Sequence, residues 1–426
     1  MRVAVLDLGT NVFNMLLASF SKDGCQYVDE FKCAAKLGGG GLASGKISER
    51  AFDTASAAME RIIARINESG GADTIIPYAT SAVRDAANGK EFVRLMKERF
   101  GIDVRVIPGE REAEFIFKGI IRSLAEEAPE TVGITGTAGD SAGDFAGDFA
   151  GAGDAVADSA VDFVGAGDGG TVADSVVEFV GDGGAVAESV AEFAGAGDGG
   201  AVAESVAEFV GVGDGGAVAE SAAEFVGVGD GADDGAGVAS VAGGNILMLD
   251  IGGGSNEFII SDGKKVLWKE SFPIGMARMR ERFNYSEPIA REVIYEFEEY
   301  CNGVLEPLWR QIEIYRPRIF VGSSGSFDTF KDLMFGPGAE YKACRVLPAE
   351  DLLELHEKLL VSTAAERLAM PRMSPIRVDY IVLASIFTQM VLRRVEPEVI
   401  YQSAYSLKEG AMAEHYENWQ KRGELD

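Results

Sequence analysis

Two segments far apart in the chain repeat one pattern: an apolar strand, an Asp-x-Gly turn and a second apolar strand. The first turn reads DLGTN from Asp7 and the second reads DIGGGSN from Asp250. A single glycine-rich turn is weak evidence, because most such turns only connect strands. Two turns with the same prefix predict two related domains that face each other across a cleft, whereas a pair of ordinary hairpins is the simpler interpretation.

The chain has 426 residues, of which 47% are hydrophobic, so it can build a large core and exceeds one typical domain. Apart from one insertion, strands and helices alternate in two blocks, as is typical of the α/β class. We expect a first domain over residues 1–127, an insertion over residues 128–244 and a second domain over residues 245–426. The last helix of the second domain is a candidate to return to the first.

The insertion consists of nearly verbatim 16-residue repeats. A clear unit reads AVAESVAEFVGVGDGG from Ala201. Its apolar residues have helical spacing, but its glycines end any helix after about three turns, so we expect disorder or short frayed helices without a catalytic role. A calcium-binding solenoid or a docking segment is the alternative, since Gly-Asp-Gly turns offer oxygen ligands.

Each of the two turns can bind a phosphate group. Glycines let successive backbone N–H groups converge on an anion, and Thr10, Asn11, Ser255 and Asn256 add side-chain donors. The two turns therefore predict two opposed anion sites.

Carboxylates occur in the same two glycine-rich turns. Asp7 and Asp250 interrupt apolar strands at their ends, where an unpaired buried carboxylate is costly. A divalent cation removes that cost, and oxygen ligands beside phosphate favour Mg²⁺, with Mn²⁺ as the alternative. Glu257 is the third candidate ligand. The chain has only two histidines and its four cysteines form no CxxC pair, which disfavours other metal chemistry.

Two further residues lie at predicted helix starts in the first block. Arg84 follows the expected strand over residues 74–79, where it can bind phosphate oxygens or form a surface ion pair. Glu112 lies in the first turn after Pro108 and Gly109. The helix dipole alone favours an acidic residue there, and a catalytic base is the functional alternative.

Seven motifs, in this order, resemble the exopolyphosphatase and guanosine pentaphosphate phosphohydrolase family, and they span nearly all of the chain outside the insertion. They are DLGTN from Asp7, ATSAVRDAAN from Ala79, IPGEREAEFIFKG from Ile107, DIGGGSNEF from Asp250, PIGMAR from Pro273, GSSGS from Gly322 and RVDYIVLASI from Arg377. The resemblance implies the actin-like ATPase fold, which sugar kinases and actin share, with two related domains around a cleft. The chain is similar to the short, two-domain form.

The resemblance also implies roles for individual residues. Glu112 matches the catalytic base that activates water, Asp250 and Glu257 match acidic residues around the metal, and Lys36 matches a basic position near the cleft. The residues expected to bind the metal are Asp7, Asp250 and Glu257. The residues expected to bind phosphate are Gly9, Thr10, Asn11, Arg84, Gly252, Gly253, Gly254, Ser255, Gly322, Ser323 and Gly325.

The function expected from the motifs is that of a phosphoanhydride hydrolase. An exopolyphosphatase would release terminal orthophosphate from inorganic polyphosphate by Mg²⁺-assisted in-line attack of water. Guanosine pentaphosphate phosphohydrolysis is the nearer alternative. An ATP-dependent kinase or a nucleotide-binding sensor of the same fold is the more distant one.

The net charge of −29 at first argues against a polyanionic substrate. Residues 131–244 contain 21 acidic groups and no Lys or Arg, however, so the remainder has a net charge of only −8. The chain shows no export signal and no apolar run near 20 residues, so we expect a cytoplasmic protein without membrane or nucleic-acid partners. Pairing through faces distant from the cleft would give a homodimer.

Overall fold

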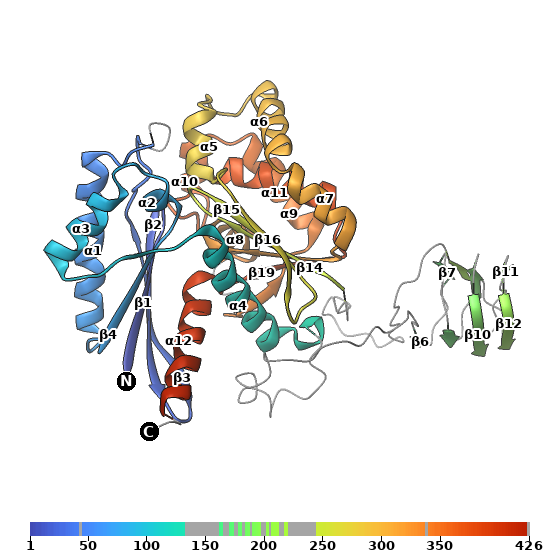
Figure 1. Cartoon of the computed structure of the whole chain (residues 1–426). Helices are drawn as coiled ribbons and strands as arrows, with labels where there is room; N and C mark the ends of the chain where they lie inside the picture. The colour runs from blue at the N-terminus through green and yellow to red at the C-terminus, as the bar shows by residue number, and fades with distance from the viewer. Residues whose placement is uncertain are drawn as a thin grey trace. The chain divides into compact units, whose positions relative to one another are not determined.

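The computed structural model describes residues 1–41, 45–132, 244–336 and 340–423, together with short strands between residues 162 and 219. Residues 1–146 and 243–426 form one compact unit, and residues 147–242 form another. The first unit has two lobes, each built on its own sheet (Figure 1). Lobe I comprises residues 1–132 and the last helix, and lobe II comprises residues 244–406.

The sheet of lobe I has the order β3-β2-β1-β4-β5. Strands β1, β2 and β3 form an antiparallel meander, and β4 and β5 continue the sheet in parallel with β1. The central strand is a continuous apolar run because both of its faces are covered. The bounds are β1 Arg2–Leu8, β2 Val12–Ser21, β3 Gly24–Ala34, β4 Thr74–Ala79 and β5 Arg105–Val106.

Helices cover both faces of this sheet. Helices α1 and α3 bury an apolar stripe on one face, and α12 packs on the other, with α4 against α12 (Figure 1). The last helix of the chain therefore packs on lobe I. The bounds are α1 Glu49–Glu68, α2 Ser81–Arg84, α3 Gly89–Phe100, α4 Gly109–Glu127, the 3-10 turn η1 Pro129–Val132 and α12 Leu407–Gly423.

The sheet of lobe II has the order β16-β15-β14-β17-β19-β18, so its first five strands repeat the topology of lobe I. Here β14 pairs antiparallel with β15 and parallel with β17, as β1 does with β2 and β4. This repetition confirms the actin-like fold with two related α/β lobes. The bounds are β14 Ile246–Ile251, β15 Asn256–Ser261, β16 Val266–Phe272, β17 Ile319–Ser323, β18 Cys344–Val346 and β19 Val399–Ser403.

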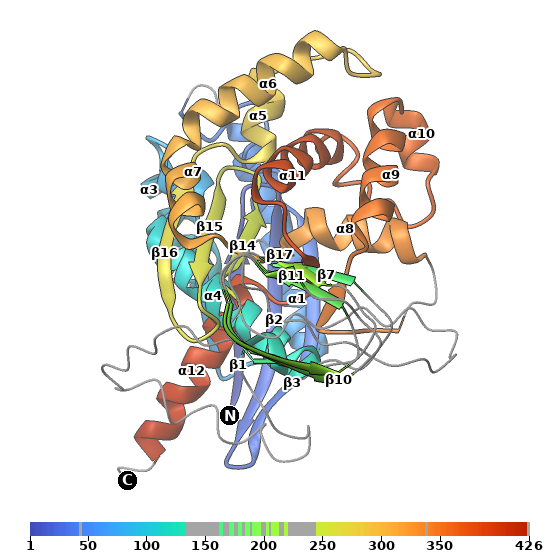
Figure 2. The same ribbon diagram turned by 90° about the vertical axis from the view of Figure 1, so that its right-hand side faces the viewer.

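The helices of lobe II form its larger apolar core around α11, whose residues are buried almost all round. Figure 2 shows these helices beside the sheet of lobe II, at the end of the molecule away from α12. The bounds are α5 Met276–Arg282, α6 Arg291–Val304, α7 Glu306–Tyr315, α8 Ser324–Phe335, α9 Ala349–Leu360, α10 Ala364–Ala369 and α11 Ile381–Val395.

Helix α4 joins the two lobes. It packs on α12 and also contacts β15 and β16 of lobe II (Figure 1). Its start is therefore oriented by both lobes. Among the helices that the structure describes, none has the length and apolar character required to cross a membrane.

The described part of the insertion consists of short parallel strands, so the expectation of frayed helices is wrong there. Paired strands are in register at the repeat length, with Val190 opposite Val206 and Val186 opposite Val202. Valine and phenylalanine favour strands, and identical units pair naturally in register. The Gly-Asp-Gly turns of the calcium-binding alternative lie outside the described residues. The bounds are β6 Asp162–Val164, β7 Gly170–Ala173, β8 Glu178–Val180, β9 Gly184–Ala187, β10 Val190–Ala196, β11 Val202–Ala203, β12 Val206–Val212 and β13 Ala217–Ala219.

Candidate functional site

The two glycine-rich turns meet at the junction of the lobes. A Cβ atom on Gly253 would lie 2.9 Å from Asn11 Nδ2, and one on Gly254 would lie 2.7 Å from Thr10 Oγ1. Ser81, at the start of α2, also touches Gly254, and its Oγ lies 3.3 Å from Thr10 Oγ1. The turns are thus in direct contact, and glycine is required there because a side chain would keep them apart.

The carbonyl groups of both turns accept hydrogen bonds from residues of their own lobes. In lobe II, Gly252 O accepts from Met276 N at 2.9 Å and Gly253 O accepts from Ala277 N at 2.9 Å. In lobe I, Thr10 O accepts from Gly38 N at 3.0 Å. These bonds fix the orientation of the peptide planes of the two turns.

The amide groups of the same peptide planes point the other way, because C=O and N–H are opposed in a trans peptide. They are the N–H groups of Asn11, Gly253 and Gly254. Among the residues that the structure describes, none of these three amides has a hydrogen-bond acceptor. Unpaired amides in adjoining glycine-rich turns can form an anion site. Thr10, Asn11 and Ser255 are buried beside them.

Carboxylates occupy equivalent register positions in the two lobes. Asp7 of β1 stands opposite Asn14 of β2, and Asp250 of β14 stands opposite Glu257 of β15. Asn14 Nδ2 donates to Asp7 Oδ2 at 2.8 Å. Lobe I therefore has an amide where lobe II has a second carboxylate. Sequence reasoning missed Asn14, although aligning the two turns places it seven residues after Asp7, as Glu257 follows Asp250.

Hydroxyl groups hold one oxygen of each carboxylate in lobe II. Ser323 Oγ donates to Asp250 Oδ2 at 2.9 Å, and Ser406 Oγ donates to the same oxygen. Ser255 Oγ and Ser271 Oγ both donate to Glu257 Oε1 at 2.7 Å. The Ser324 side chain also interacts with Asp250 and opposes the rise in the pKa of Asp250 that burial causes.

Burial and mutual repulsion raise the pKa values of this acidic group. Burial raises the pKa of Asp7 to about 6, with a further contribution from the charge of Asp250. Burial and the charge of Asp250 raise the pKa of Glu257 to about 7. Burial and the charge of Glu257 raise the pKa of Glu112 well above its ordinary value, although Arg84 opposes this shift. Neighbouring carboxylates that cannot easily all be ionised at once form a site suited to a cation.

The arrangement fits a cation that is only partly held by protein. Among the described side chains, no three acidic, cysteine or histidine groups converge closely enough to hold an ion together. Mg²⁺ usually keeps several waters and is bound by one or two carboxylates together with substrate phosphates. The carboxylates of Asp250 and Glu257, with Asp7 nearby, are consistent with that mode.

Helix α4 brings Glu112 into this acidic group. Gly109 begins the helix against β16, where a Cβ atom on it would lie 2.5 Å from Ser271 Cβ. Glu112, in the first turn, is buried, and Arg84 Nη1 donates to its Oε2 at 2.9 Å and to Ile107 O at 3.2 Å. Arg84 is thus the ion-pair partner of Glu112, a pairing that the sequence did not indicate. Its expected phosphate contact stays a prediction.

The third glycine-rich segment supports Asp250. Gly322 lies in β17 with the Phe327 ring against it, and Ser323 is bonded to Asp250. Gly325 packs against the guanidinium of Arg377, whose charge opposes the rise in the pKa of Asp250 that burial causes. Arg377 opens one of the quoted motifs but received no role from the sequence. Lys36, the expected basic residue, is exposed and donates its backbone N–H to Asn11 O at 3.0 Å.

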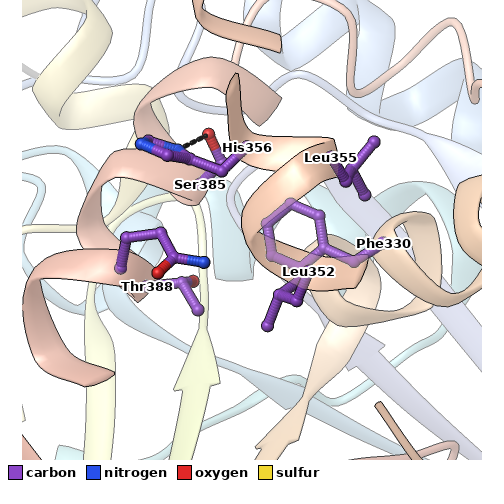
Figure 3. Close-up of a pocket in the computed structure, with 7 residues that line it drawn as sticks. Phe330, Leu352, Leu355, His356, Ser385 and Thr388 are labelled. Carbon is purple, nitrogen blue, oxygen red and sulfur yellow. Dashed lines mark hydrogen bonds between the residues drawn. The ribbon is translucent and has the colours of Figure 1, made fainter. Parts of the chain in front are cut away.

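The two histidines lie away from the carboxylates. His356 lines a small pocket between α8, α9 and α11, where its Nδ1 is 3.1 Å from Ser385 Oγ (Figure 3). Burial lowers the pKa of His356 to about 4, so the ring is neutral at physiological pH. The pocket is too narrow to hold even a water molecule. His415 bonds the hydroxyl of Tyr78 at 2.8 Å.

Comparison with known proteins agrees, over most of the chain, with the family resemblance that the seven motifs carry. A family model described as "Ppx/GppA phosphatase family" matches residues 18–137 and 234–418. A stretch of 158 residues is 29% identical to Exopolyphosphatase 2 of Mycobacterium tuberculosis and covers 36% of this chain and 49% of that protein. A stretch of 123 residues is 29% identical to Exopolyphosphatase 1 of the same organism and covers 29% of this chain and 36% of that protein. The chain thus spans about half or less of the length of these curated relatives.

Solved structures match over almost the whole length. A crystal structure of an exopolyphosphatase from Cytophaga hutchinsonii has 25% identity and a TM-score of 0.68, with 98% of each chain covered. The Aquifex aeolicus member of the Ppx/GppA family has 17% identity and a TM-score of 0.58, also with 98% of each chain covered, and this likeness concerns the fold alone.

Proposed function

Because the chain belongs to the Ppx/GppA phosphatase family, we propose that it is an exopolyphosphatase that releases terminal orthophosphate from inorganic polyphosphate. The observation that carries this proposal is the meeting of two glycine-rich turns beside Glu112. Their unpaired amides offer an anion site, and Glu112, a buried carboxylate paired with Arg84, lies close enough to Glu257 and Asp7 to interact with their charges. The names of the relatives support polyphosphate as the substrate.

In the proposed reaction the two turns bind the oxygens of the terminal phosphoryl group through their amides and through Thr10, Asn11 and Ser255. Fixed N–H donors stabilise the charge that develops in phosphoryl transfer, and this is the main catalytic requirement. Since the turns are in contact in the structure, the lobes would separate to admit substrate and close on it.

Glu112 would orient a water molecule and accept its proton as the water oxygen attacks phosphorus. The bond between phosphorus and the bridging oxygen breaks, and the shortened chain leaves. Arg84 favours the ionised form of Glu112, which is the form that can accept a proton. Asp250 and Glu257, with Asp7 nearby, would hold Mg²⁺, which would neutralise negative charge on the phosphates.

The experiment that tests the role of Glu112 is Glu112→Gln. The amide can still accept from Arg84 but cannot take a proton, so we expect kcat for orthophosphate release to fall by about 10²- to 10⁴-fold with little change in KM. Glu110→Gln, an exposed residue of the same helical turn, is the matched control. Wild-type turnover by a folded Glu112→Gln variant would remove Glu112 from the mechanism.

Guanosine pentaphosphate is the second candidate substrate, because the description of the matching family model names both Ppx and GppA. It also ends in a phosphoanhydride, so the same residues could hydrolyse it. Orthophosphate release from long-chain polyphosphate and from guanosine pentaphosphate, measured side by side, separates the two. We expect the higher kcat/KM with polyphosphate, and the reverse order would assign the protein to the nucleotide substrate.

A further inference from the structure

The segment between β19 and α12 crosses from lobe II to lobe I beside the acidic group. Ser406 is the last residue before α12, and its hydroxyl donates to Asp250 Oδ2. Asp250 belongs to β14 of lobe II, while α12 packs on β1, β2 and α4 of lobe I. The Ser406 hydroxyl therefore connects the segment that leads into α12 with the carboxylate of Asp250.

The sequence around Ser406 offers a purely structural explanation, which is helix capping. Ser406 and Glu409 have the Ser-x-x-Glu spacing of a capping box. Half of the box is present, because Glu409 Oε2 accepts from Ser406 N at 2.9 Å. Among the described residues, the Ser406 hydroxyl is bonded to Asp250 and accepts from no backbone amide of the first turn. Its hydrogen is thus committed to the acidic group.

The position of Ser406 is fixed from several sides. Glu409 also pairs with Lys408, whose Nζ lies 3.2 Å from Glu30 Oε1 on β3. Gly119 of α4 approaches the Ser406 carbonyl so closely that a Cβ atom there would overlap it. Contacts from both lobes thus hold the backbone around Ser406, because Tyr405 N also donates to Ser403 Oγ of β19, so the hydroxyl is presented to Asp250 at a defined point.

We propose that Ser406 is a positioning residue for the divalent cation. With Ser323 it holds Asp250 Oδ2 and so fixes the orientation of the carboxylate that would bind the cation. The inference rests on the proposed function, since it concerns the cation of that site. Hydrogen bonds to a ligating carboxylate fix its orientation, and loss of one such partner typically costs 10- to 100-fold in metal affinity.

The test is Mn²⁺ binding to the full-length, substrate-free protein, followed by electron paramagnetic resonance. The acidic insertion binds Mn²⁺ unspecifically, so the signal of Asp250→Asn defines the background to be subtracted. We expect Ser406→Ala to raise the specific dissociation constant about 10-fold and Ser406→Thr, which keeps the hydroxyl, to stay near wild type. In activity assays Ser406→Ala should require more Mg²⁺ for half-maximal rate, with kcat at saturating Mg²⁺ nearly unchanged.

Ser123→Ala is the matched control. Ser123 is fully buried at the same junction and its Oγ lies 2.7 Å from Ser403 Oγ, but it does not touch Asp250. We expect its Mn²⁺ affinity to equal that of wild type. If wild type binds Mn²⁺ specifically and Ser406→Ala binds it equally well, Ser406 has only a capping role and the proposal is overturned while the proposed function stands. If wild type shows no specific Mn²⁺ binding and hydrolyses polyphosphate without metal, the metal part of the proposed function fails as well.

Discussion

Glu257 is the residue whose removal should most clearly reveal the electrostatic state of the site. It is 1% exposed, and burial together with the charge of Asp250 raises its pKa from 4.5 to about 7. Glu257→Gln removes the ionisable group and keeps the packing. The amide oxygen can still accept from Ser255 and Ser271, which both donate to Oε1 in wild type.

The sign of the effect follows from linkage between ionisation and folding. A carboxyl whose pKa is raised in the folded state stabilises the fold fully below pH 4.5, and this contribution is lost as the pH rises through about 7. At about 1.4 kcal/mol for each pH unit between the two pKa values, the loss is about 3 kcal/mol at pH 8. The Gln variant does not suffer this loss.

Thermal unfolding in EDTA at pH 5 and pH 8 measures the difference. We expect Glu257→Gln to be more stable than wild type by about 3 kcal/mol at pH 8, or about 5 °C in Tm, and nearly equal to wild type at pH 5. Added Mg²⁺ at pH 8 should stabilise wild type more than the variant, because binding to the folded state adds stability. Polyphosphate hydrolysis by the variant should fall at the same time.

Exposed Glu296 on α6 provides the control, since Glu296→Gln should change Tm equally little at both pH values. A Glu257→Gln variant that is less stable than wild type at pH 8 in EDTA would refute the reasoning. So would a stability difference of the same size at pH 5 and pH 8, because it would show that packing and not ionisation is responsible.

Two further predictions concern the turns and the insertion. Gly254→Ala should lower kcat/KM for polyphosphate by at least about 100-fold. The new Cβ atom would overlap Ser81 and lie 2.7 Å from Thr10 Oγ1. Wild-type kinetics in this variant would mean that the turns need not touch. Replacing residues 133–243 by a short glycine linker should leave activity within about threefold, because Val132 and the start of β14 both lie beside the β15–β16 turn. Inactivity of that variant, with a folded state shown by circular dichroism, would give the insertion a catalytic role.

The pattern within each turn was sufficient to predict the two lobes. Strand, Asp-x-Gly turn and strand are local features, and their repetition at Asp7 and Asp250 predicted two related domains; the shared order of five strands came from the structure. The same local reasoning placed Glu112 in the first turn of a helix, which α4 confirms. Local reasoning was wrong for the insertion, where helical spacing of apolar residues was outweighed by pairing between identical units along the chain.

The partners of the site residues depended on tertiary structure. Arg84 and Glu112 are 28 residues apart, and Ser406 lies 156 residues from Asp250, so no spacing rule relates them. Their meeting depends on how α4 and α12 pack between two sheets, and that packing is set by buried area summed over many side chains. The chain by itself therefore determined which chemical groups each turn carries, because turn chemistry is local. Only the packed fold decided which of those groups form hydrogen bonds or ion pairs or shift one another's pKa, because such contacts join elements that are distant in sequence.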